Sequence, residues 1–145
     1  MDRPTAARLT ELWGLSTMPA ENVAFAQTYV DTKIGSDGKP LCTAMIGMVT
    51  DDPETFSDLH TLPTDELWHF YLGDPIELLL LDPDGTDELV LLGQDVLAGQ
   101  VVHTVVPAGG CMGARLLPAA STVSTDARWL RASSCRTFRP REQRI

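Results

Sequence analysis

The sequence predicts an all-β protein, an antiparallel sandwich or barrel preceded by one short helix. Short apolar runs of strand length recur along the chain, and turn signals rich in Gly, Pro, Asp and Ser separate them about every eight to twelve residues. Helical periodicity is confined to the N-terminal residues. The sequence contains no linker, repeat or low-complexity segment, so residues 1–145 are expected to form one domain.

Residues 4–15 are predicted to form the helix. Apolar side chains recur there at helical spacing, Thr5 is a suitable N-cap, and Gly14 is a typical stop signal.

The strands are predicted from apolar runs that lie between turn signals. The glycine-rich turn 35–40 joins the first two runs into a hairpin, and the turn 82–87 joins a later pair. The predicted strands are residues 23–32, 41–50, 76–81, 89–92, 99–106 and 112–117, with a last strand opening near Trp129.

Charge is distributed unevenly along the chain. The net charge is −9, yet six of the 11 basic residues lie in the Arg-rich C-terminal segment, residues 128–145. They are Arg128, Arg131, Arg136, Arg139, Arg141 and Arg144. The acidic body argues against nucleic-acid binding, because a phosphate backbone requires a basic surface. We expect this segment to be a strand or extension that neutralises the acidic body of this chain or of a partner, rather than an arm for nucleic acid or membrane.

The sequence favours a cytoplasmic protein. No apolar run approaches the ~20 residues that a membrane span requires, and the N-terminal residues show no secretory signal. Three widely spaced cysteines, Cys42, Cys111 and Cys135, favour free thiols over a disulfide framework.

Aromatic and titratable side chains are densest in residues 59–73. If this stretch is extended, side-chain alternation places Glu66, Trp68 and Phe70 on one face and His69 on the other. We expect His69 to be packed and hydrogen-bonded between sheets.

Two segments resemble the motifs of the cupin superfamily. Residues 60–75, HTLPTDELWHFYLGDP, resemble the signature of its cupin_5 (DUF985) family, and residues 105–115, VVPAGGCMGAR, resemble the second motif of that family. The resemblance covers roughly residues 5–140. It implies a cupin-type antiparallel β-barrel (a double-stranded β-helix or jelly roll) and a homodimer.

The chain departs from the family where a metal would bind. Leu62 and Met112 stand where metal-binding cupins carry two of their three histidines, which leaves His60 and Glu66 from the usual ligand set. Two ligands seldom hold a transition metal tightly. No metal and no other cofactor are therefore expected. In addition, residues 18–22, MPAEN, replace the family's His-Pro-Glu-Gly-Gly segment.

His60 and Glu66 are the predicted catalytic pair. They are an even number of residues apart, so both lie on the same face if the stretch is extended. The cupin resemblance implies that this face points into the barrel. An imidazole and a carboxylate inside an apolar lumen are suited to acid–base catalysis near neutral pH. The alternative is that the two groups only satisfy each other structurally.

The resemblance and the alternation also predict substrate contacts in the lumen. The predicted contacts are Trp68, Phe70, His103, Met112, Arg115 and Tyr29. Arg115 has two expected roles, orienting an anionic substrate group or pairing with an acidic residue.

These residues predict a metal-independent small-molecule enzyme of the isomerase or epimerase, cyclase or dehydratase type. The apolar lining favours a substrate of secondary metabolism, and the family resemblance implies carbohydrate metabolism as the other setting. Two alternatives stay open. One is a cupin that binds a small molecule without catalysis. The other is a metal-dependent oxygenase or isomerase in which His69 or His103 joins His60 and Glu66.

Overall fold

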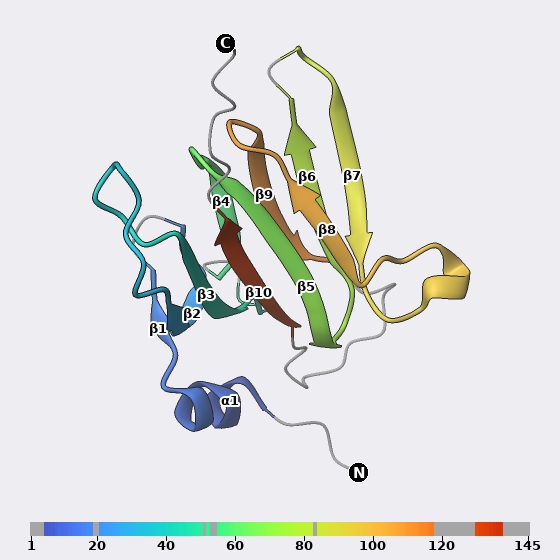
Figure 1. The fold of residues 1–145 in the computed structure, drawn as a ribbon. Helices are drawn as coiled ribbons and strands as arrows, with labels where there is room; N and C mark the ends of the chain where they lie inside the picture. Colours follow the sequence, from blue (N-terminus) through green and yellow to red (C-terminus); the bar gives the residue numbers. More distant parts are fainter. Residues whose placement is uncertain are drawn as a thin grey trace.

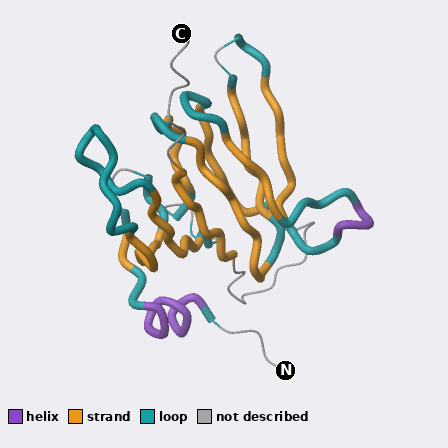
Figure 2. Tube along the Cα trace, viewed as in Figure 1, coloured by secondary structure: helices purple, strands orange, loops and turns teal. Residues whose placement is uncertain are grey.

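The computed structural model describes residues 5–18, 21–50, 52, 55–82, 84–117 and 130–137, and it shows two antiparallel β-sheets with one short helix (Figures 1 and 2). The elements in chain order are α1 (Ala6–Trp13), β1 (Ser16–Thr17), β2 (Ala24–Val30), β3 (Cys42–Met48), β4 (Ser57–Thr61), β5 (Asp65–Gly73), β6 (Ile76–Leu81), β7 (Asp87–Leu92), the 3₁₀ turn η1 (Val96–Ala98), β8 (His103–Val106), β9 (Cys111–Leu116) and β10 (Leu130–Thr137).

The two sheets differ in size. A six-stranded sheet has the order β1-β2-β3-β10-β5-β8, and a four-stranded sheet has the order β4-β9-β6-β7. Neighbouring strands are antiparallel in both sheets. The predicted all-β antiparallel architecture is confirmed. No helix in the described part of the chain is long and apolar enough to cross a membrane.

The hydrophobic core lies between the two sheets. Trp68 and Phe70 of β5 face it from the six-stranded sheet, and Leu78 of β6 and Met112 of β9 face it from the other. Burial along β5 alternates residue by residue, as expected for a strand with one face on the core. The predicted inward face of Glu66, Trp68 and Phe70 is confirmed.

Helix α1 packs against the opposite, outer face of the six-stranded sheet. Its N-cap and C-cap are the predicted residues: the Thr5 side chain accepts a hydrogen bond from the Arg8 backbone N–H, and Gly14 adopts the left-handed conformation with φ 60°. Leu9 of α1 forms a second apolar cluster with Met48 of β3. The helix thereby covers one end of this sheet.

Residues 59–73 are not one continuous strand. The chain turns at residues 62–64, so β4 belongs to the four-stranded sheet and β5 to the six-stranded one. The turn is held by two hydrogen bonds to the loop after β8. The Gly109 N–H donates to the Leu62 carbonyl oxygen at 2.8 Å, and the Ala108 N–H donates to Asp65 Oδ1 at 3.0 Å.

Of two predicted strands in the C-terminal part of the chain, one is shorter than expected and one forms as expected. Strand β8 begins at His103 rather than at residue 99, because η1 and a following loop occupy residues 96–102. The expected last strand forms as β10, and it pairs with β3 on one side and β5 on the other, inside the sheet (Figure 1). Residues 138–145 of the Arg-rich C-terminal segment lie outside the described residues.

Candidate functional site

His60 of β4 points into the space between the sheets with a fixed ring orientation. Its Nδ1 lies 2.7 Å from the backbone carbonyl oxygen of Asp58. A carbonyl oxygen only accepts hydrogen bonds, so Nδ1 carries the proton. In the neutral ring, Nε2 therefore has a free lone pair, and it is the atom able to accept a proton from a substrate.

Two carboxylates face this nitrogen. Nε2 lies 3.7 Å from Glu21 Oε2 and 4.0 Å from Glu66 Oε2. Among the described residues, Nε2 has no hydrogen-bond partner. All three side chains are largely buried, and Glu66 is only 1% exposed. The predicted pair of His60 and Glu66 is thus brought together, with a second glutamate beside it.

Glu21 reaches the site because its loop is tied to β4. The Asp58 N–H donates to the Glu21 carbonyl oxygen at 3.1 Å, and the Asn22 side-chain amide donates to Asp58 Oδ2 at 3.1 Å. Asn22 adopts a positive φ of 54°, a conformation that asparagine tolerates better than most residues. Glu21 was not among the site residues predicted from the sequence. One sequence signal could have identified it. Glu21 is the acidic residue of the segment 18–22, which replaces the family's His-Pro-Glu-Gly-Gly segment.

Three predicted substrate contacts lie in the core around this group. Met112 of β9 is directly opposite His60 of β4 in the strand register and is almost fully buried. Trp68 and Phe70 are buried on the same face of β5 as Glu66. The indole Nε1 of Trp68 is a buried donor without a hydrogen-bond acceptor among the described residues.

The other three predicted contacts lie elsewhere. His103 is exposed and pairs in register with His69 on the outer face of the six-stranded sheet. The expected positions of His103 in the lumen and of His69 between the sheets are therefore both wrong, because both residues alternate with the inward-facing ones. Tyr29 is 51% exposed on β2. Arg115 Nε lies 2.7 Å from Glu77 Oε2, which corresponds to the second of its two expected roles.

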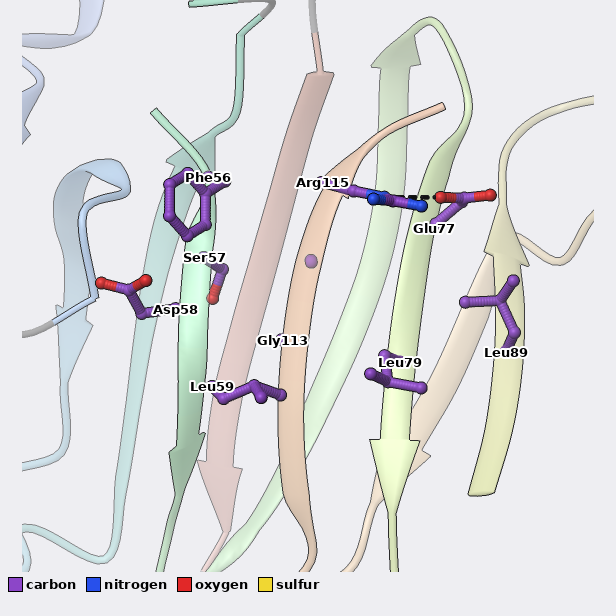
Figure 3. A pocket seen from close by; sticks show the side chains of 10 residues that line it. Phe56, Ser57, Asp58, Leu59, Glu77, Leu79, Leu89, Gly113 and Arg115 are labelled. Carbon is purple, nitrogen blue, oxygen red and sulfur yellow. Dashed lines mark hydrogen bonds and ion pairs between the residues drawn. The ribbon is translucent and has the colours of Figure 1, made fainter. Parts of the chain in front are cut away.

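The Arg115–Glu77 pair borders a hollow on the outer face of the four-stranded sheet (Figure 3). The hollow has a volume of about 820 Å³ and is lined largely by apolar side chains. Its apolar lining includes Phe56, Leu59, Leu79 and Leu89. Gly113 lies at its floor, where a Cβ atom would come within 3.0 Å of Leu59 Cδ2. On β9, Arg115 follows the buried, inward-facing Ala114. Because side chains alternate along a strand, Arg115 faces away from the lumen.

A smaller cavity of about 310 Å³ lies between the start of β3 and the turn that joins β4 to β5. Its lining includes Thr43 of β3 and the turn residues Pro63 and Thr64. Thr43 and Glu66 lie in one cross-strand row, with a single residue of β10 between them. Two strand spacings amount to about 10 Å. The cavity thus lies about 10 Å from Glu66 across the sheet, and Glu66 is not part of its lining.

The donor atoms in the described part of the lumen do not form a metal site. No three His, Cys, Asp or Glu side chains in that part of the chain come together with the spacing needed to hold a metal ion. The site contains one imidazole and two carboxylates, and Met112 occupies the place opposite His60.

Two antiparallel sheets that enclose a largely buried histidine from one sheet and a buried glutamate from the other are typical of a cupin-type barrel. The chain belongs to the DUF985 family of the cupin superfamily, and the sequence pattern of this family matches residues 7–129. The resemblance drawn from residues 60–75 and 105–115 is confirmed.

Solved structures with the same fold include two that match most of this chain. A hypothetical protein from Leishmania major is 22% identical, with a TM-score of 0.77, and the match covers 92% of this chain and 81% of that one. A protein from Shewanella oneidensis is 18% identical, with a TM-score of 0.76 and coverages of 94% and 81%. An oxalate decarboxylase from Lactobacillus farciminis is 12% identical, with a TM-score of 0.53 and coverages of 88% and 32%. No curated protein matches the chain. At these identities, the likeness to the solved structures shows the fold.

Proposed function

We propose that this protein is a small-molecule enzyme in which His60, assisted by Glu66 and Glu21, transfers a proton inside the barrel. The observation that carries the proposal is the position of Nε2, a buried nitrogen 3.7 Å and 4.0 Å from two carboxylate oxygens. The Asp58 carbonyl oxygen holds the ring so that this nitrogen faces the carboxylates.

The three groups support acid–base chemistry. His60 Nε2 takes a proton from a carbon or hydroxyl of the substrate, and the nearby carboxylates stabilise the imidazolium that forms. The proton then returns to another face or atom of the substrate, or it leaves with an expelled hydroxide as water. The first outcome is isomerisation or epimerisation, and the second is dehydration. Neither needs an oxidant or a reductant.

The lumen walls favour a substrate with an apolar body and few polar groups. Trp68, Phe70 and Met112 supply apolar and aromatic surface, and the indole N–H of Trp68 supplies one hydrogen-bond donor. A polyketide-type intermediate fits this lining, and stacking on Trp68 also permits a sugar ring. Secondary or carbohydrate metabolism is therefore the proposed setting.

A metal-dependent mechanism receives less support from the residues present. The described donors near His60 do not form a set of three with metal-ligand spacing, and Leu62 and Met112 fill positions that carry histidines in metal-binding cupins. No step is assigned to a metal.

Proton NMR in D₂O tests the proposal. Protein without a His-tag is incubated with a panel of ketones, sugars and polyketide-type compounds, and both product formation and deuterium incorporation are followed. We expect turnover of at least one compound class and losses of roughly 10²- to 10⁴-fold in the H60Q and E66Q variants. H103Q, a substitution outside the lumen, is the matched control and should keep full activity. Ligand binding without turnover would instead identify a binding protein, and full activity in H60Q would overturn the assignment of the base.

We also propose a homodimer in the cytoplasm with a small molecule as its other partner. Cys42 and Cys111 are free thiols in the structure, which suits a reducing compartment. Light scattering on the full chain tests the dimer, and a monomeric mass at micromolar concentration would contradict it.

A further inference from the structure

Two histidines lie side by side on the outer face of the six-stranded sheet. His69 of β5 and His103 of the edge strand β8 are directly opposite each other in the strand register. Their ring centroids are 4.6 Å apart, and the ring planes are inclined by 32°. His60, the third histidine of the chain, is on β4 in the other sheet.

The spacing of the two rings suits chelation of one ion. A bond between a metal and an imidazole nitrogen is about 2.1 Å long, so two rings that share an ion at a right angle would have centroids about 4.5 Å apart. The observed separation is 4.6 Å. Rotation of the two side chains can therefore direct a nitrogen of each ring at one ion while the strands keep their register.

The pair lies at the surface, beside the edge of the six-stranded sheet. His103 is exposed, so a bound ion would remain open to water on that side. Tyr71 stacks beside His69 on the same strand, with ring centroids 6.4 Å apart.

We propose that His69 and His103 form a surface site for a divalent transition-metal ion of the class that prefers imidazole ligands at right angles, namely Cu²⁺ or Ni²⁺. The two rings supply adjacent coordination positions, and water or an external ligand completes the coordination sphere. The site is separate from the lumen, and it needs neither His60 nor the proposed acid–base chemistry. With two protein ligands, binding is weak and reversible.

A titration of the tag-free full chain with Ni²⁺ tests the site. Paramagnetic Ni²⁺ broadens the NMR signals of nearby protons, and the chain has only three histidines to resolve. We expect the ring protons of His69 and His103 to broaden first and together, at one ion per chain, while those of His60 stay sharp. The folded protein should also gain thermal stability as Ni²⁺ is added, because the ion binds the native state.

Three variants decide the outcome. Loss of either ring in H69Q or H103Q should weaken Ni²⁺ binding roughly tenfold or more, because the second ligand otherwise acts intramolecularly. The H60Q variant retains both rings and is the matched control. Unchanged Ni²⁺ affinity in both H69Q and H103Q would overturn the proposal, as would broadening of the His60 signals before those of the pair. Because His103 is exposed, H103Q is expected to fold even if H69Q does not.

Discussion

The imidazole of His60 and the carboxylate of Glu66 come from opposite sheets, and their nearest atoms, Nε2 and Oε2, lie 4.0 Å apart inside the barrel. The separation is too long for a direct hydrogen bond. It leaves Nε2 accessible to a substrate atom while a carboxylate remains close enough to stabilise the protonated ring. The tether between Glu21 and β4 brings a second carboxylate to the same nitrogen.

The first prediction concerns the tautomer of His60. Because Nδ1 donates to the Asp58 carbonyl oxygen, the neutral ring should carry its proton on Nδ1 and none on Nε2. Long-range ¹H–¹⁵N correlation spectra of the histidine rings distinguish the two tautomers directly. A neutral His60 with its proton on Nε2 would contradict the assignment of Nε2 as the base.

Alternation and turn signals predicted most of the fold, because these signals are local. Thr5 and Gly14 fixed the limits of α1, and the alternation along β5 correctly placed Glu66 and Trp68 inward. His60 also faces inward, but the predicted reason was wrong. It does not share a strand with Glu66, because the chain turns at residues 62–64.

Contacts that depend on pairing between distant segments could not be predicted from these local signals. Glu21 reaches His60 only through the hydrogen bonds between its loop and Asp58, 36 residues from Asn22 in the chain. The outward position of His103 depends on the start and register of β8, which η1 and the loop after it determine. One sequence without structural information specifies neither relationship.

The second prediction is that Met112→Ala destabilises the protein strongly. Met112 is 1% exposed and packs in the core opposite His60, so its truncation leaves a cavity. We expect a loss of about 2–5 kcal/mol in the free energy of unfolding, measured by urea denaturation. Leu97→Ala is the control, because Leu97 is 98% exposed and its truncation should change stability by less than about 0.5 kcal/mol. Equal effects of the two substitutions would place Met112 outside the core.

The third prediction concerns Arg115, which pairs with Glu77 on the outer face. Arg115→Gln should leave turnover unchanged, because the side chain does not face the lumen. The Arg115 side chain is 69% exposed, so the pair should contribute no more than about 1 kcal/mol to stability. Parallel activity and denaturation measurements check both expectations. A loss of substrate affinity in this variant would restore the substrate-binding role.

The fourth prediction follows from the internal position of β10. Truncation after residue 129 removes a strand that pairs with both β3 and β5, and it exposes two unpaired strand edges. We expect this variant to lose cooperative thermal unfolding and to aggregate. Truncation after Thr137 keeps β10 and should retain the native circular dichroism spectrum and a cooperative transition. A well-folded shorter variant would contradict the strand order of the six-stranded sheet.

The fifth prediction concerns the pH dependence of stability. Burial, and secondarily His103, hold the pKa of folded His69 below its ordinary value of 6.5. Between the folded and unfolded pKa values, the unfolded chain binds more protons, so this group makes stability rise with pH and level off above about 6.5. Melting temperatures measured across this range should show a shallower rise in His69→Gln. His103→Gln should reduce the slope only in part, because burial is the larger cause and it persists when His103 is replaced. If the melting temperature rose equally with pH in the wild type and in both variants, His69 would not be the titrating group.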